Sequence, residues 1–294
     1  EQSTAPNRAS IDVPPPKTPP APQGLVALPA SCSVRLQWDA VSDDPLMAYE
    51  VYRAGAGSDD FRPVTPEPVR TTELADSSVE VGKEYAYTVR AVSRRGARSE
   101  SSAPLRATPT IIQEPVFSLS AEGRREAEVL GGEPVPGKLS GDARFENGVL
   151  TLAKRGWLAF DRRGEFDLFQ PFSVELWVKF DEPGQMPVVA GAGEWNNAGW
   201  FLQRIGGRWR WHVGGVSCDG GRPAIGPWLH VAAIWDGEKL RLFQDGKLVG
   251  EKAGPINTAV WPGEMIVGQY AASLRADYQT HGSIAGLKIY HRPL

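Results

Sequence analysis

The stretch from Pro227 to Gly250 constrains the fold of this chain more than any other. Two Asp-Gly pairs, Asp236-Gly237 and Asp245-Gly246, separate three short runs that are rich in apolar residues. An Asp-Gly pair between apolar runs is a strong hairpin signal, because a type I′ turn needs a positive φ at both central residues. The stretch therefore predicts three consecutive antiparallel β-strands.

Length and charge narrow the possible classes of protein. A chain of 294 residues has room for two domains, and its 32 glycines and 25 prolines suit a turn-rich, all-β protein. The formal net charge of −3 gives no basic surface of the kind that nucleic acids or anionic membranes attract. No apolar run approaches the roughly 20 residues that a membrane-spanning helix needs. We therefore expect no nucleic-acid partner and no membrane insertion.

Residues 1–22 predict a linker. The segment is rich in proline, with Pro14-Pro15-Pro16 and Pro19-Pro20, and it has no apolar periodicity. Such a composition favours an extended, polyproline-like tether, and the alternative is a ligand for a proline-recognition domain. The first residues are not a signal peptide, so either a signal has been removed or the chain is a fragment of a longer one.

The two cysteines do not assign a cellular compartment. Cys32 and Cys218 lie in different halves of the chain, so neither half can hold a disulfide of its own. Two unpaired, small hydrophobic residues are the commoner arrangement, and a bridge between the halves is the alternative.

Short alternating strands fill residues 23–109. Val34, Leu36 and Trp38 share one face of one run, and turn signals separate about seven such runs without any helical period. This pattern predicts a β-sandwich with Trp38 in its core. The segment resembles a fibronectin type III domain, which implies an immunoglobulin-like sandwich that acts as a spacer. The matching stretches are Val34-x-Leu36-x-Trp38, Tyr49-x-Val51, Val81 to Val92, Gly96-x-x-Ser99 and Ala107-Thr108-Pro109.

Residues 110–294 predict a second all-β domain. Phe172 to Phe180 alternates between apolar and polar residues, as a half-buried strand does. The segment resembles the laminin G-like, concanavalin A-like jelly-roll domains that are common in secreted bacterial proteins. The matching stretches are Phe172 to Phe180, Trp228-x-His-Val-Ala, Trp235-Asp-Gly, Leu240-x-Leu-Phe, Gln244-Asp-Gly-Lys-Leu-Val and Gly282 to Leu294. The resemblance implies two antiparallel sheets packed face to face, with ligands at one rim or on the concave sheet.

Two loops of the second domain combine aromatic and polar side chains. They are residues 193–200 and residues 277–281. A flat ring suits the C–H face of a pyranose, and amides and acids suit its hydroxyls. If both loops meet at one rim they would form a shallow saccharide site; the alternative is that Trp195 only anchors its loop and Tyr278 is exposed incidentally. The candidate ligand-binding residues are Glu194, Trp195, Asn196, Asn197, Asp277, Tyr278 and His281.

Catalytic and metal sites have little support in the sequence. Glu165-Phe-Asp167-Leu-Phe-Gln170 is similar to the Glu-x-Asp-x-x-Glu motif of a glucanase family with the same jelly roll. That chemistry needs two carboxyl groups about 5–5.5 Å apart, and Gln170 cannot supply a proton as an acid does. The motif also falls in a predicted loop. We therefore expect no catalytic residue.

Calcium is the remaining cofactor to consider. Relatives bind it through loop oxygens, of which it needs six to eight. The family's last strand often carries an Asp-Glu pair, but this chain has Ala285 and Gly286 at those positions. We expect no cofactor, and the weak calcium candidates are Asp219 and Asp277.

Together these features predict a non-catalytic, extracytoplasmic binding or adhesion module. The jelly roll would recognise carbohydrate or a cell-surface protein, and the chain would be extracellular, periplasmic or at the cell surface, alone or as an accessory part of a polysaccharide-active enzyme. The alternative is a structural or assembly subunit of a cell-surface complex. A polysaccharide hydrolase or lyase is disfavoured, because no carboxylate pair or His/Tyr constellation is evident.

Overall fold

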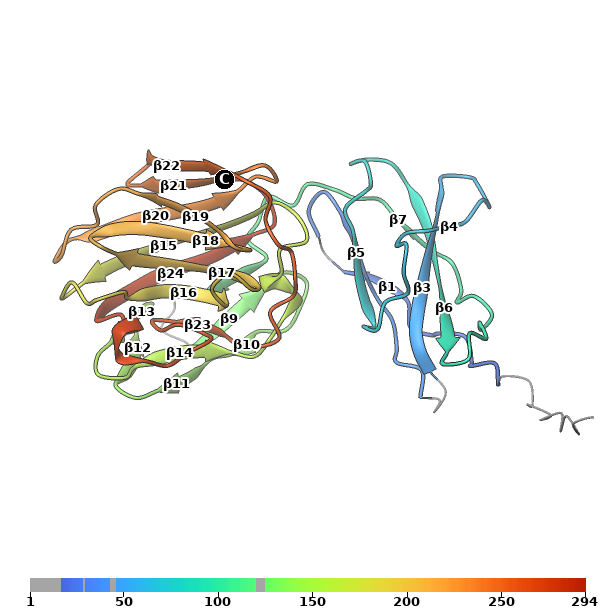
Figure 1. Ribbon diagram of the computed structural model, residues 1–294, viewed down its shortest axis with the longest axis horizontal. Coiled ribbons are helices and arrows are strands. Elements are labelled where there is room, and N and C mark those ends of the chain that lie inside the picture. Colours follow the sequence, from blue (N-terminus) through green and yellow to red (C-terminus); the bar gives the residue numbers. More distant parts are fainter. Residues whose placement is uncertain (1–16, 29, 43–45, 120–124) are drawn as a thin grey trace, which may run out of the picture. The chain divides into compact units, whose positions relative to one another are not determined.

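The computed structural model describes residues 17–28, 30–42, 46–119 and 125–294 (Figure 1). Most of the linker expected over residues 1–22 therefore lies outside the described residues. The chain divides into two compact units, one made mainly of Arg35–Asp76 and Lys83–Thr108 and the other mainly of Pro109–Leu294. The expected all-β fold is confirmed. No helix in the described part of the chain is long and apolar enough to cross a membrane.

The first unit contains a three-stranded and a four-stranded antiparallel sheet, in the orders β1-β2-β5 and β4-β3-β6-β7. The strands are β1 (Val26–Leu28), β2 (Val34–Gln37), β3 (Leu46–Gly55), β4 (Arg62–Pro63), β5 (Glu73–Asp76), β6 (Tyr85–Ser93) and β7 (Leu105–Ala107). Trp38 is buried and packs edge-on against Tyr49, with 5.4 Å between ring centroids. Trp38 is thus a core residue, as the alternation predicts.

The second unit is a sandwich of a ten-stranded and a seven-stranded sheet (Figure 1). The strands of the ten-stranded sheet are β8 (Phe117–Leu119), β9 (Glu126–Val129), β10 (Val135–Pro136), β12 (Ala143–Glu146), β13 (Val149–Leu152), β15 (Phe172–Phe180), β20 (Trp228–Trp235), β21 (Lys239–Gln244), β22 (Lys247–Ala253) and β24 (Gly282–Tyr290). Its order is β10-β9-β8-β24-β15-β20-β21-β22, and β13 pairs with both β12 and β24.

The seven-stranded sheet has the order β11-β14-β23-β16-β17-β18-β19. Its strands are β11 (Lys138–Ser140), β14 (Trp157–Phe160), β16 (Val188–Gly193), β17 (Gly199–Ile205), β18 (Arg208–Val213), β19 (Val216–Gly220) and β23 (Met265–Val267). Two single-turn 3₁₀ helices, η1 (Gly164–Phe166) and η2 (Ala276–Tyr278), lie in connecting segments.

The three strands expected between Pro227 and Gly250 are present as β20, β21 and β22. Asp245 and Gly246, with φ of 50° and 74°, make the turn between the last two strands. The carboxylate of Asp236 accepts main-chain N–H bonds from Glu238 and Lys239 at the other turn. Local turn chemistry therefore fixes the register of this half of the sheet.

Alternation along the strands fills the core between the two sheets. On β15, the inward side chains from Phe172 to Phe180 are fully buried. Facing them, Trp200, Trp209 and Trp211 of the seven-stranded sheet are also fully buried. The indole N–H of Trp200 donates to the carbonyl of Phe166 at 3.0 Å, so burial leaves its polar group satisfied. Neither cysteine is in a disulfide, and the Cys218 thiol lies in this core.

Candidate functional site

Alternate residues of the seven-stranded sheet point into the core, and the residues between them point to its outer face. On β17, Phe201 and Gln203 point away from the core, between the inward side chains of that strand. On β18, His212 lies directly opposite Phe201, and Arg210 lies opposite Gln203. Cross-strand pairs of this kind bring side chains into contact on one face of a sheet. Two aromatic rings and two polar groups therefore meet on the solvent side.

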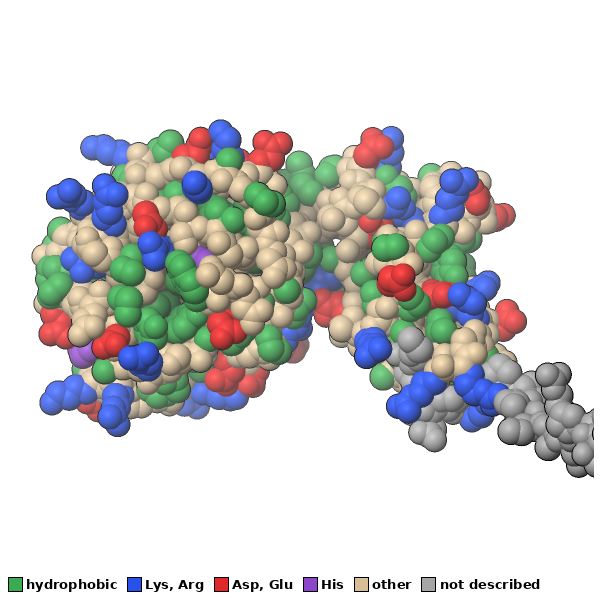
Figure 2. Space-filling model, viewed as in Figure 1, with side chains coloured by type: hydrophobic (Ala, Val, Ile, Leu, Met, Phe, Trp, Pro, Cys, Tyr) green, Lys and Arg blue, Asp and Glu red, His purple; other side chains and the backbone are tan. Residues whose placement is uncertain are grey.

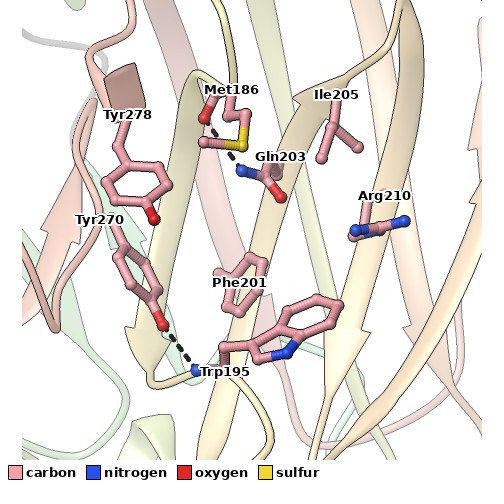
Figure 3. A pocket seen from close by; sticks show the side chains of 8 residues that line it. All are labelled: Met186, Trp195, Phe201, Gln203, Ile205, Arg210, Tyr270 and Tyr278. Atoms are coloured by element: carbon pink, nitrogen blue, oxygen red, sulfur yellow. Dashed lines mark hydrogen bonds between the residues drawn. The ribbon is translucent and has the colours of Figure 1, made fainter. Parts of the chain in front are cut away.

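A pocket of about 190 Å³ lies on this face. The strands β17 and β18 form its floor, the loop after β16 supplies Trp195, and the segment between β23 and β24 supplies Tyr270 and Tyr278 (Figure 3). In Figure 2 hydrophobic side chains gather over the same part of the seven-stranded sheet. The lining residues are Met186, Trp195, Phe201, Gln203, Ile205, Arg210, Tyr270 and Tyr278.

The ring of Trp195 is held in place from beneath. It stacks on His212 with 4.4 Å between centroids and 20° between planes, and Phe201 stacks on the same His212 ring at 4.6 Å. The main-chain N–H of Trp195 donates to the hydroxyl of Tyr270 at 2.5 Å (Figure 3). Trp195 nevertheless remains 45% exposed. The loop thus presents a fixed, flat aromatic surface to solvent.

Two tyrosines form the opposite side of the pocket. The ring of Tyr270 meets Phe201 edge-on at 5.3 Å and packs against Tyr278 at 4.9 Å. Burial raises the pKa of Tyr270, so its hydroxyl stays protonated at neutral pH. The hydroxyl accepts the Trp195 N–H and keeps its own proton available for a further acceptor.

Polar groups at the pocket are fixed by partners outside it. Arg210 forms two hydrogen bonds to the carboxylate of Asp219, at 2.7 and 2.6 Å, and its guanidinium carbon lies 5.3 Å from the centre of the Trp195 ring. The side-chain amide N–H of Gln203 donates to the carbonyl of Met186 at 3.0 Å, which leaves its oxygen pointing into the pocket (Figure 3). The site therefore offers donors and acceptors in set positions.

His212 is neutral and serves as the support for the aromatic stack. Its Nε2 accepts the main-chain N–H of Asn196 at 3.4 Å, so the ring proton lies on Nδ1, which donates to the hydroxyl of Ser217 at 2.8 Å. Burial lowers the pKa of His212 to about 4; nearby Arg210 adds to this effect, and Asp219 opposes it. A charged imidazolium would therefore be unfavourable beneath Trp195.

The buried His212 predicts a pH-dependent stability. An unfolded histidine binds its proton near pH 6.5, whereas the folded one does so near pH 4. The stabilisation is thus fully present above about pH 6.5 and is lost as the pH falls towards 4, by up to roughly 3 kcal/mol. Chemical unfolding at several pH values should show a steeper loss for the native chain than for His212→Asn. Equal slopes for the two proteins would contradict the prediction.

The structure brings together only some of the residues that the sequence suggested. Trp195 and Tyr278 line the same pocket, joined through Tyr270. Glu194 and Asn197 belong to the Trp195 loop but bond to each other, the Asn197 amide donating to the Glu194 carboxylate at 2.6 Å. Asn196, at a φ of 56°, contributes its main-chain N–H to His212.

The acids and the histidine of the second loop lie elsewhere. Asp277 pairs with Arg275 at 3.5 Å, and His281 pairs with Glu182 at 3.3 Å and lines a different pocket. Asp219 is occupied by Arg210. Within the described ranges, no three His, Cys, Asp or Glu side chains gather in a way that could hold a metal ion.

Both acidic residues of the glucanase-like motif form local ion pairs. Glu165 lies in η1 and pairs with Arg163 at 3.1 Å, and Asp167 pairs with Arg162 at 2.6 Å. The motif therefore falls in a connecting segment and not on a strand, as expected.

Six of the eight residues that line the pocket were not predicted from the sequence, namely Met186, Phe201, Gln203, Ile205, Arg210 and Tyr270. One signal was available for Phe201. The run Trp200-Phe201-Leu202 is aromatic or apolar on both faces of β17, so one of its faces had to carry a large ring away from the core. Tyr270 gave no such signal, because its position depends on the pairing of β23 with β16.

Comparison with known proteins agrees with this architecture. Residues 153–294 match the model of the concanavalin A-like lectin/glucanases superfamily, and the two-sheet sandwich of this part of the chain has the architecture that the match implies.

Solved structures resemble parts of the chain. The binding domain of botulinum neurotoxin serotype D is 12% identical over 61% of this chain and 49% of its own, with a TM-score of 0.48. Domain 4 of AbnA, an extracellular arabinanase from Geobacillus stearothermophilus solved with arabinotriose, is 14% identical over 62% of this chain and 94% of its own, with a TM-score of 0.49. An Fn3-like protein from Clostridium thermocellum is 26% identical over 33% of this chain and 98% of its own, with a TM-score of 0.28. The chain spans about half the length of the neurotoxin binding domains that it matches.

Proposed function

We propose that the jelly-roll domain is a carbohydrate-binding module and that the pocket around Trp195 is its binding site. The observation that carries the proposal is the exposed face of Trp195, which is fixed from below by His212 and Phe201. A rigid ring offers a sugar an apolar surface at little cost in conformational entropy, because the ring is ordered before the ligand arrives.

The groups around the ring suit the hydroxyls of a sugar. The oxygen of Gln203 accepts hydrogen bonds, the hydroxyl of Tyr270 donates one, and the Arg210–Asp219 pair offers both kinds of partner. All are held by other contacts, so binding would not have to order them. The volume of about 190 Å³ is below the roughly 300–1,000 Å³ of pockets that enclose a drug-sized ligand. The site therefore suits one sugar ring, and the remaining rings of an oligosaccharide would lie across the outer face of the seven-stranded sheet.

The test is a glycan-array screen followed by calorimetry with the best ligand. Trp195→Ala should weaken binding by about 10- to 100-fold, since the ring supplies most of the apolar contact. The matched control is Trp177→Ala on the ten-stranded sheet, because Trp177 is 48% exposed and so loses a ring of similar exposure. Unchanged circular dichroism should show that both variants are folded. Absence of any glycan ligand, or equal losses in both variants, would contradict the proposal.

We further propose the role of the whole chain. Residues 1–22 act as a linker, residues 23–109 as a fibronectin type III spacer, and residues 110–294 as the binding module of an extracytoplasmic, non-catalytic protein. Its work would be adhesion, or targeting of an attached enzyme to a polysaccharide. A protein that assembles into a larger complex would instead show a mass in solution that rises with concentration, together with no glycan binding.

A further inference from the structure

The segment between β23 and β24 also contributes to a second and larger pocket. Tyr270 and Tyr278 of this segment line the Trp195 pocket, whereas Leu274 and Gln279 line another hollow of about 790 Å³. The same hollow is lined by Lys154 and Arg155 of the turn before β14 and by Trp157, the first residue of β14. A single loop therefore separates two pockets of the same domain.

The second pocket carries two cations that have no counter-charge among its lining residues. Its remaining ionisable residue, His281, pairs with the carboxylate of Glu182 at 3.3 Å. Lys154 and Arg155 are exposed at its rim, and within the described chain neither side chain forms an ion pair or a hydrogen bond. No carboxylate is among the described residues that line the pocket. Elsewhere in this domain, arginines such as Arg210 and Arg241 are paired with acids. The rim of the pocket thus favours an anion.

The two cations sit on a rigid turn. Arg155 has a φ of 52°, and the N–H of Gly156 donates to the carbonyl of Ala153 at 2.9 Å. Asp142 fixes the turn from the side, since its N–H donates to the Lys154 carbonyl and its carbonyl accepts from Ala153. A non-glycine residue in the left-handed region persists where surrounding contacts over-determine it. The turn is therefore held in place before any ligand binds.

Apart from Lys154, Arg155 and His281, the lining of the pocket is apolar or neutral. Trp157, which is half-buried, and Leu274, which is 54% exposed, give it apolar surface. The amides of Gln269 and Gln279 are used within the protein, to Tyr270 N–H and to the Gly156 carbonyl, each at 2.8 Å. A suitable ligand would hence combine a flat apolar face with a negative charge.

We propose that this second pocket binds an acidic sugar, with its carboxylate or sulfate group against Lys154 and Arg155 and its ring against Trp157. The choice of a sugar over other anions rests on the proposed function. A saccharide bound in the Trp195 pocket would be separated from the second pocket only by the segment between β23 and β24, which lines both. The preference for a negative charge rests only on the residues of the second pocket.

The experiment is calorimetry of the full chain with three tetrasaccharides, namely tetragalacturonate, a sulfated carrageenan fragment and neutral galactotetraose. At least one acidic ligand should bind about tenfold more tightly than the neutral one, and this preference should weaken with added salt. The double variant Lys154→Gln/Arg155→Gln should lose the preference. The control, Lys247→Gln/Lys252→Gln on β22, removes the same charge from exposed residues of the other sheet and should retain it.

The outcomes separate this inference from the proposed function. Equal affinities for acidic and neutral ligands would overturn the acidic-sugar site while leaving the Trp195 pocket intact. Equal losses in the two double variants would also overturn it, since binding would then follow net charge alone. If Lys154→Gln/Arg155→Gln binds acidic ligands more weakly but Trp195→Ala does not, the acidic-sugar site is supported and the Trp195 site is not. The relative affinities of carboxylated and sulfated ligands identify the anion.

Discussion

A chain that ends before Leu287 is expected to have an unfolded jelly-roll domain. Residues 287–294 supply the second half of β24, which lies inside the ten-stranded sheet with β15 on one side and β8 and β13 on the other. The side chains of Leu287 and Ile289 are fully buried. The deletion would also leave the edges of β8 and of part of β15 without partners.

The stabilising free energy that the deletion removes is expected to exceed the total free energy of unfolding of a domain. Truncation of one buried leucine or isoleucine to alanine costs about 2–5 kcal/mol, and here several buried side chains and their backbone bonds are removed, against a typical total of about 5–15 kcal/mol. Tryptophan fluorescence should shift to longer wavelengths, since nine of the ten tryptophans lie after residue 110. Deletion of only Pro293 and Leu294, which are exposed, is the control and should leave the domain folded. A soluble truncation at residue 286 that keeps the tryptophan emission of the intact chain would refute the prediction.

The strands were predictable because their determinants are local. Period-two alternation from Phe172 to Phe180 names the buried face without reference to any other strand, since a shift of one residue would turn that face to solvent. The same holds for the Asp-Gly turn at residues 245–246, because the positive φ that the turn requires concerns these two residues alone.

The site was only half predictable because it depends on contacts between distant parts of the chain. Trp195 is recognisable as an aromatic in a polar loop, but its support, His212, comes from the pairing of β17 with β18. Tyr278 and His281 are close in sequence and were expected to act together. In the structure they line different pockets, because the chain leaves η2 at Tyr278 and has reached the start of β24, at Gly282, by the position of His281.

Gly199→Ala is expected to destabilise the domain and to disable the Trp195 pocket together. Gly199 begins β17 at a φ of 72°, and a methyl group there would collide with the main-chain carbonyl of Ala192 on the neighbouring β16. Backbone cannot yield as a flexible side chain can. We expect a loss of about 3–5 kcal/mol, from the left-handed φ and the steric conflict combined, and a displaced loop that no longer seats Trp195 on His212.

Gly206→Ala provides the matched control for this variant. Gly206 has a φ of 56° in the turn between β17 and β18, but a methyl group there would meet open space. It therefore isolates the conformational cost, about 1–2 kcal/mol, from the collision. Chemical unfolding and glycan calorimetry of both variants should show a large loss of stability and binding for Gly199→Ala and a small loss of stability alone for Gly206→Ala. Equal stabilities and equal glycan affinities for the two variants would contradict the prediction. They would mean that the position of Trp195 on His212 does not depend on the close approach of β16 and β17 at Gly199.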